Sequence, residues 1–127
     1  KRPEELLVRI EVPALAGARA SYRKLRRRGS FDFPVLGVAV WVSFDGEGKV
    51  AAARIVLGAV GSHPKLVEDA AAALVGGTLE DDQLEEAARL ASKLAKPLDN
   101  TDFTIGWRKD MAPVFVRRAL EGLRSVG

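Results

Sequence analysis

The chain has 127 residues, no cysteine and a single histidine, His63. Without cysteine, it has no disulfide, iron–sulfur ligand or catalytic thiol of its own. With one histidine, the chain cannot form a metal motif that needs two histidines, and it has only one candidate for a serine–histidine couple. Metalloenzyme and hydrolase functions are therefore poorly supported.

Long hydrophobic runs are also missing, because lysine and arginine interrupt every apolar stretch before the roughly 20 residues of a membrane span. The start lacks the pattern of a signal peptide, so we expect a cytoplasmic protein. The chain begins at Lys1 rather than at methionine, which predicts a segment of a longer polypeptide. With 47% hydrophobic and 29% charged residues, it is typical of one globular domain with one core.

The net charge of +3 is unevenly distributed along the chain. Residues 1–30 hold nine lysines and arginines against three acidic residues, whereas residues 31–127 carry a net negative charge. The basic cluster consists of Arg19, Arg23, Lys24, Arg26, Arg27 and Arg28. Such a cluster needs an anionic partner, an acidic neighbour or full solvation.

Hydrophobic periodicity predicts β-strands in the first half of the chain. Residues 6–12 and 18–25 alternate between apolar and polar side chains, as in half-buried strands. Residues 35–44 are apolar at nearly every position, which predicts a central strand covered on both faces. A glycine turn and a return strand over 50–60 complete a hairpin.

The second half changes to helical spacing. We expect helices over residues 64–75, 78–96 and 103–124, the second opened by a capping box at Thr78 and the third containing Pro113. Strands followed by helices indicate an α+β fold. We therefore predict an antiparallel sheet of three to four strands followed by three helices packed on one face.

Several patterns that resemble functional sites have simpler structural interpretations. The acidic residues 80–86 fit the start of a solvated helix, where the helix dipole favours negative charge. The glycines of 58–61 and 104–106 lack the full spacing of a nucleotide loop and fit a turn and a helix entry. His63 fits a loop, and the two tryptophans fit a core or an interface.

The basic strand over residues 19–28 is the strongest local indication of function. It combines Tyr22, a stacking surface, with cations that suit phosphate or ring anions. Either nucleic acid or an anionic cofactor would fit this combination. Charge that protects an edge strand from aggregation would fit it as well.

Five segments occur here in an order typical of one known family: residues 21–34, 38–40, 53–60, 71–76 and 107–120. Together they resemble the C-terminal domain of the FAD-binding medium subunit of molybdenum hydroxylases, the group of carbon monoxide dehydrogenase, xanthine dehydrogenase and 4-hydroxybenzoyl-CoA reductase. Residues 18–127 would form this domain. Residues 1–17 would be the last strand and linker of a missing FAD-binding region.

The resemblance implies an FAD-dependent oxidoreductase subunit that transfers electrons between FAD and iron–sulfur clusters. Its partners would be a molybdopterin large subunit and an iron–sulfur small subunit. The two glycine-rich FAD loops of the family are not found in this sequence, so we expect the isolated chain to be inactive. Residues 99–112 are most similar to 4-hydroxybenzoyl-CoA reductase relatives.

The resemblance also implies that the strand over 18–25 approaches the isoalloxazine ring of FAD. Tyr22 would contact the ring, and either Lys24 or Arg23 would place a cation at its polar edge. Tyr22 and Lys24 share one face of an ideal strand, so Lys24 is preferred.

Two alternatives to the flavoprotein hypothesis stay open at the level of sequence. One is an independent nucleic-acid-binding α+β domain that uses the basic strand over 19–28. The other is an interaction module that docks a partner subunit through Phe31, Phe33 and the basic surface.

Overall fold

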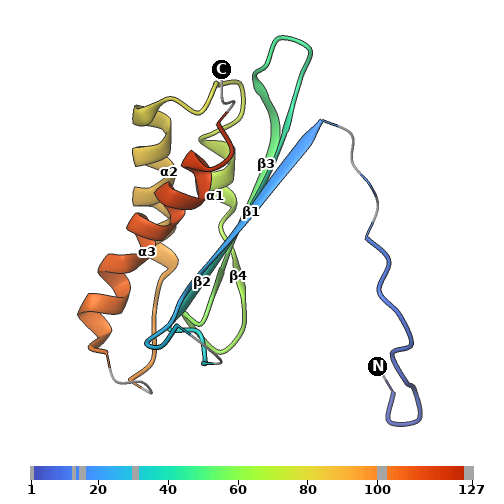
Figure 1. Ribbon diagram of the computed structural model, residues 1–127, viewed down its shortest axis with the longest axis vertical. Helices are drawn as coiled ribbons and strands as arrows, with labels where there is room; N and C mark the ends of the chain where they lie inside the picture. The colour runs from blue at the N-terminus through green and yellow to red at the C-terminus, as the bar shows by residue number, and fades with distance from the viewer. Residues whose placement is uncertain (1, 13, 15–16, 30–31, 100–102, 125–127) are drawn as a thin grey trace.

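The computed structural model describes residues 2–12, 14, 17–29, 32–99 and 103–124. The strands form one antiparallel sheet in the order β1-β2-β3-β4, and the helices follow it in the chain (Figure 1). The elements are β1 (Ala18–Leu25), β2 (Leu36–Phe44), β3 (Val50–Gly58), β4 (Lys65–Leu66), α1 (Glu68–Ala72), α2 (Asp81–Leu94) and α3 (Ile105–Glu121). The prediction of an α+β fold is confirmed.

The central hairpin of β2 and β3 forms at a turn whose geometry its residues dictate. The Asp45 carboxylate accepts hydrogen bonds from the backbone N–H groups of Glu47 and Lys49, both at 2.9 Å. Gly48 has a φ of 78°, a conformation that glycine adopts without a steric penalty. This turn sets the register in which Val40 lies opposite Ile55.

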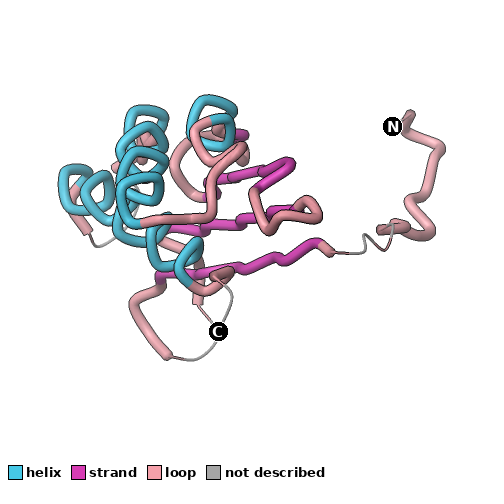
Figure 2. Tube along the Cα trace, turned by 90° about the horizontal axis from the view of Figure 1, so that it is seen from above, coloured by secondary structure: helices cyan, strands magenta, loops and turns pink. Residues whose placement is uncertain are grey.

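The three helices of the described residues lie on one face of the sheet, as Figure 2 shows. The sheet contributes large aliphatic side chains to the core, and the helices contribute smaller ones that allow close approach. The fully buried sheet residues of this core are Leu36, Val38, Val42, Val50, Ile55 and Leu57. The fully buried helix residues are Ala70, Leu84, Ala87, Ala91, Ala112, Val116, Ala119 and Leu120.

The opposite face of the sheet is open in the described part of the chain. On β2, Ala39, Trp41 and Ser43 are half-buried, while their neighbours Val40 and Val42 are buried. The prediction that residues 35–44 are covered on both faces is therefore wrong for this chain. This face combines apolar side chains such as Trp41 and Val56 with polar ones such as Arg54, and the helices lie on the other side of the sheet.

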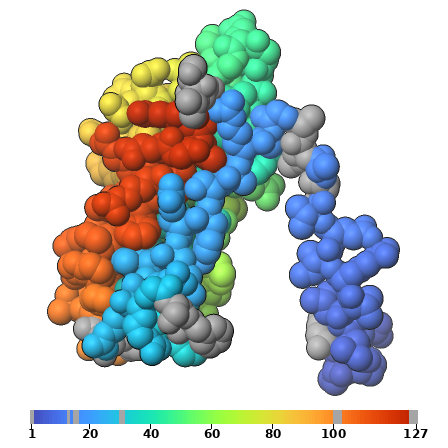
Figure 3. All heavy atoms as spheres, in the orientation of Figure 1, coloured from blue at the N-terminus to red at the C-terminus, as the bar shows by residue number. Residues whose placement is uncertain are grey.

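The predicted strand over residues 6–12 is not formed. Its apolar side chains are exposed, including Leu6 at 85% and Val8 at 88%, and the segment stands apart from the body of the molecule (Figure 3). An alternating pattern provides the side chains of a strand, but the backbone still needs a neighbouring strand with which to pair.

The starts of the first two helices also differ from prediction. Residues 65–66, expected in the first helix, pair with β3 as β4, because Leu66 and Lys65 lie opposite Val56 and Leu57. Thr78 does not cap the second helix: Gln83 Oε1 instead accepts the N–H groups of Thr78 and Leu79 at 3.1 and 3.2 Å.

The third helix runs through Pro113 from Ile105 to Glu121. No helix among the described residues combines the length and apolarity needed to cross a membrane.

A single buried arginine connects α3 to three loops at one end of the sheet. Arg108 is 3% exposed and donates hydrogen bonds to the carbonyls of Leu98, Val35 and Ala59, at 2.5, 3.1 and 2.7 Å. Burial lowers the pKa of its guanidinium, because a desolvated charge is disfavoured. The guanidinium group thus binds backbone carbonyls instead of water, and these hydrogen bonds hold this end of the sheet against the helix layer.

Candidate functional site

Strand alternation on β1 separates the three predicted site residues. Tyr22 and Lys24 lie opposite Ala39 and Gly37 on the open face of the sheet. Arg23 lies opposite the buried Val38 and faces the helix layer. The structure therefore brings Tyr22 and Lys24 together and places Arg23 on the other side, as the expected alternation predicts.

The ring of Tyr22 lies against a glycine on the neighbouring strand. A Cβ atom at Gly37 would stand 3.1 Å from the Tyr22 hydroxyl and 3.6 Å from the nearest ring carbon. Glycine at this position thus allows the ring to lie close to the backbone of β2. Tyr22 is nevertheless 62% exposed, so the side of its ring that faces away from Gly37 is open to a ligand.

A second glycine continues this row across the sheet. Gly58 on β3 pairs with Gly37, and a Cβ atom there would meet only the Gly37 backbone, at 3.9 Å. No side chain of the described residues therefore comes within 4 Å of a Cβ atom at Gly58. Gly37 itself is buried against the Tyr22 ring, whereas Gly58 is half-buried and leaves backbone that a flat group could approach closely.

Lys24 is connected to the loop that follows β1. Its Nζ donates a 2.6 Å hydrogen bond to the backbone carbonyl of Asp32. The Asp32 carboxylate accepts the backbone N–H of Arg28 at 3.1 Å and that of Phe33 at 2.9 Å. The hydrogen bonds from Arg28 lower the pKa of Asp32, because they stabilise its ionised form.

Beside Tyr22, the open face has a shallow apolar hollow of about 480 Å³. Trp41 and Val56 are large apolar residues of its lining, and Ala20 and Ala39 are small ones. Arg54, opposite Trp41 in the sheet, adds a cation at its border. Small and aromatic side chains on a flat sheet suit a planar ring better than an extended polar ligand.

These residues fit the isoalloxazine ring of FAD. The exposed Tyr22 ring, which lies over Gly37, provides a stacking surface, Gly58 lets a flat ring approach the backbone, and Lys24 places a cation on the same face. A metal site has less support, since the described residues contain no cluster of three or more histidine, cysteine or acidic side chains able to hold a metal ion.

The cations of the basic strand diverge rather than form one track. Arg19 donates to the Leu123 carbonyl at 3.0 Å on the helix side, and Lys24 binds the Asp32 carbonyl near the open face. A nucleic-acid backbone needs a continuous row of cations. The arrangement therefore does not favour the predicted alternative of nucleic-acid binding through residues 19–28.

The acidic residues at the start of α2 serve a structural purpose. Asp81 accepts hydrogen bonds from Arg124 at 2.6 Å and from Arg117 at 3.3 Å, and Glu85 accepts one from Arg117 at 2.8 Å. These contacts join α2 to α3. The interpretation of residues 80–86 as a helix start is confirmed.

The remaining candidates have local partners. His63 contacts the Ser62 hydroxyl at 3.1 Å and the Lys65 amine at 3.0 Å in an exposed loop. Thr104 caps α3 by accepting the Trp107 N–H at 3.2 Å, which confirms a helix entry there.

Of the two phenylalanines predicted to dock a partner, Phe33 is 86% exposed. Phe31 lies outside the described residues.

Sequence reasoning did not identify Gly37 and Gly58 as part of one surface. The two glycines are far apart in the chain, and they become neighbours only through the register of β2 and β3. The two glycines lie at nearly equal distances from the hairpin turn, which could have indicated that they pair. The irregularity between Ser43 and Phe44 shifts the register, so counting back from the turn does not give the exact pairs. Arg108 was missed as well, because nothing in its sequence context distinguishes a buried arginine.

Comparison with known proteins identifies the family. The sequence profile described as "CO dehydrogenase flavoprotein C-terminal domain" matches residues 20–123. The carbon monoxide dehydrogenase medium chain of Afipia carboxidovorans is 34% identical over 124 residues, which are 97% of this chain and 42% of that protein. The aldehyde oxidoreductase FAD-binding subunit of Escherichia coli is 39% identical over 75 residues, which are 59% of this chain and 22% of that subunit.

A solved structure agrees with these relatives. The carbon monoxide dehydrogenase of Hydrogenophaga pseudoflava that lacks the Mo-pyranopterin moiety of the molybdenum cofactor superposes with a TM-score of 0.79 at 32% identity. The match covers 87% of this chain and 38% of that one, so the chain spans less than half the length of each of these relatives. The comparisons give no support to a nucleic-acid-binding function. The chain belongs to the CO dehydrogenase flavoprotein C-terminal domain family, as its sequence segments predicted.

Proposed function

We propose that this chain is the C-terminal domain of a flavoprotein subunit in a molybdenum-containing oxidoreductase, and that its open sheet face covers the isoalloxazine ring of FAD. The family match supports the flavoprotein assignment. The observation that carries the assignment of the face is the exposed ring of Tyr22, which lies over Gly37, with Lys24 and Gly58 on the same face.

In this proposal each residue has a defined task. Tyr22 contacts the flavin ring and excludes water from one side of it, while the absence of a side chain at Gly37 allows the tyrosine to lie close to the sheet. Lys24 places its ammonium group at the polar edge, where a positive charge stabilises negative charge that develops there. When bound, FAD supplies the electron-accepting chemistry. Arg23 contributes nothing directly, because it lies on the other side of β1.

The wider assembly is part of the same proposal. Residues 1–17 are the last strand and linker of an FAD-binding region, and the exposed apolar side chains of residues 6–12 fit a strand that pairs outside this chain. A molybdopterin large subunit and an iron–sulfur small subunit are the partners, in the cytoplasm. By itself the chain is inactive, and the similarity over residues 99–112 points to a reaction like that of 4-hydroxybenzoyl-CoA reductase.

One experiment tests where FAD is held. Titration of FAD into this chain alone, followed by flavin fluorescence, should give weak, unsaturated binding, because no glycine-rich pyrophosphate loop is found in the sequence. Tight binding of one FAD per chain would contradict the proposed division of the cofactor site.

A second experiment tests the assigned residues in the subunit that joins this chain to its FAD-binding region. Tyr22→Leu should change the flavin absorption spectrum, whereas Tyr22→Phe should preserve it because the ring remains. Lys24→Gln should lower the flavin reduction potential in a reductive titration, because a cation that favours the reduced state is lost. Arg23→Gln, with the same charge change on the opposite face, is the matched control, and an equal effect there would contradict the role of Lys24.

A further inference from the structure

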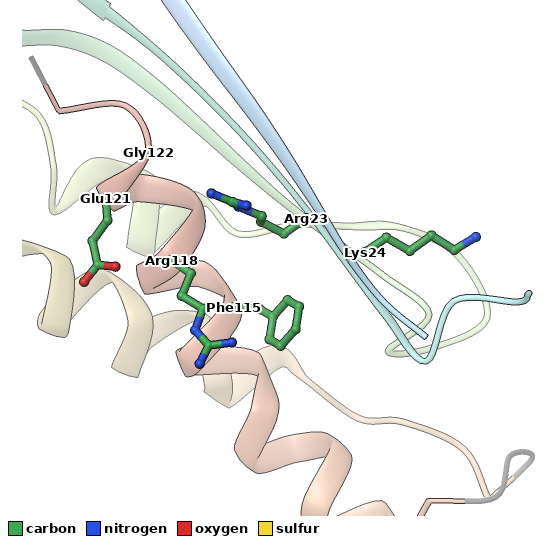
Figure 4. Close-up of a pocket in the computed structure, with 6 residues that line it drawn as sticks. All are labelled: Arg23, Lys24, Phe115, Arg118, Glu121 and Gly122. Atoms are coloured by element: carbon green, nitrogen blue, oxygen red, sulfur yellow. The ribbon is translucent and has the colours of Figure 1, made fainter. Parts of the chain in front are cut away.

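A groove runs between β1 and the C-terminal half of α3, on the side of β1 that faces the helices. It has a volume of about 520 Å³ and is lined by Arg23, Lys24, Phe115, Arg118, Glu121 and Gly122. Figure 4 shows Arg23 reaching from the strand toward Gly122, and the Phe115 ring pointing from α3 toward the strand. Of these residues, only Lys24 also belongs to the open face that carries Tyr22, and Figure 4 shows its side chain pointing away from α3.

Two arginines give this groove a positive charge, and neither has an acidic partner in the part of the chain that the structure describes. Among the described residues, the guanidinium groups of Arg23 and Arg118 make no hydrogen bond or ion pair, and Arg118 only lies over the Phe115 ring at 5.7 Å. Glu121 is the acidic residue of the lining, and it pairs with Arg117 at 2.9 Å. An incoming carboxylate would thus meet two available cations.

The strand beside the groove also has a free backbone edge. Within the described part of the sheet, β1 pairs with β2 alone, so the outer edge of its eight residues has no neighbouring strand. Such an edge offers alternating N–H and C=O groups that an extended polypeptide can match. Nucleic acid has no equivalent pattern, so the edge selects a peptide over other anions.

We propose that this groove binds an extended acidic segment of a partner protein, which pairs with the edge of β1 and directs carboxylates to Arg23 and Arg118. Side chains of an added strand alternate between the two faces, so acidic residues at every second position would reach the groove. The same arginines disfavour neutral apolar strands, because pairing would bury their charges without a partner. The edge is thereby made selective for an acidic sequence.

Binding of a defined peptide to the full chain tests the proposal. The probe is a fluorescently labelled peptide of about eight residues, matching β1, in which glutamate alternates with valine or threonine. We expect saturable binding in fluorescence anisotropy and amide shift changes on Ala18–Leu25 in NMR spectra. Arg23→Gln and Arg118→Gln should each weaken binding about threefold, and the double variant about tenfold, as expected for exposed ion pairs.

Arg54→Gln is the matched control, because Arg54 is an exposed arginine on the opposite face of the sheet. It changes the net charge equally and should leave the affinity unchanged. Equal loss in Arg54→Gln would overturn the proposal, as would absence of binding or equal binding of the peptide with glutamine at each glutamate. Tighter binding of a single-stranded DNA of similar length would also overturn it, and would identify the groove as a site for nucleic acid.

Discussion

The two faces of the sheet are built by the same strands but have opposite properties. On β3, Leu57 is fully buried beneath the helices, whereas the preceding Val56 lies half-buried on the open face. On β2, Val40 and Trp41 show the same contrast. A shift of one residue thus separates the side chains that stabilise the fold from those that are available to a ligand.

The largest expected difference between the faces lies in Leu57 and Val56. Leu57→Ala should lower the free energy of unfolding by about 2–5 kcal/mol, because it leaves a cavity in the core. Val56→Ala should lower it by less than about 1 kcal/mol, because its side chain is partly exposed. Urea denaturation of both variants measures the difference. Equal losses would mean that the open face is covered in solution.

A second prediction concerns the end of the covered face that Arg108 holds. Arg108→Met should lower the free energy of unfolding by about 2–4 kcal/mol, because the carbonyls of Val35, Ala59 and Leu98 lose a charged donor. Arg118→Met, on the exposed side of the same helix, should have little effect in the same denaturation experiment. A stable Arg108→Met variant would show that water replaces the guanidinium without loss.

A third prediction affects the open face alone. Gly37→Ala should displace the Tyr22 ring, since the added Cβ would stand 3.1 Å from its hydroxyl. The free energy of unfolding should change by less than about 1 kcal/mol, because this side of the sheet contributes little to the core. The Tyr22 ring resonances in NMR spectra report the displacement. Gly29→Ala is the control, because a Cβ atom there meets no atom within 4 Å.

The smallest expected effect lies outside both faces, at the contact between α2 and α3. The hydrogen bond from Arg124 and its charge hold the pKa of Asp81 below its usual value. A carboxylate with a lowered pKa in the folded state stabilises the protein above its unfolded pKa, and this stabilisation is lost as the pH falls through the folded value. Asp81→Asn should therefore lower Tm by no more than a few degrees at neutral pH. The difference from the wild type should vanish in acid, and a constant difference across pH would contradict the pairing.

Much of the fold follows from local pattern. Strands β1 to β3 and the helices α2 and α3 were predicted to within a few residues, because each repeats its apolar side chains at a regular spacing. Residues 6–12 have the same alternation as β1 but form no strand, since pairing depends on a neighbour that the pattern does not encode. The short strand β4 has only two residues, too few for any periodicity.

The candidate site was predictable only in part. Alternation alone places Tyr22 and Lys24 on one face, and the structure confirms it. The Gly37–Gly58 row depends on the register between two strands, and the groove beside Arg23 depends on where α3 packs. Both arise from contacts between residues distant in the chain, which sequence spacing does not reveal.

The hydrogen bonds of Arg108 have a consequence for motion. Three segments that are far apart in the sequence, around Val35, Ala59 and Leu98, share one donor side chain. We expect them to open together rather than separately, so that their amides exchange with solvent as one cooperative unit. The end of the sheet that carries Lys24 therefore moves as one rigid unit, and its rigidity depends on the side chain of Arg108.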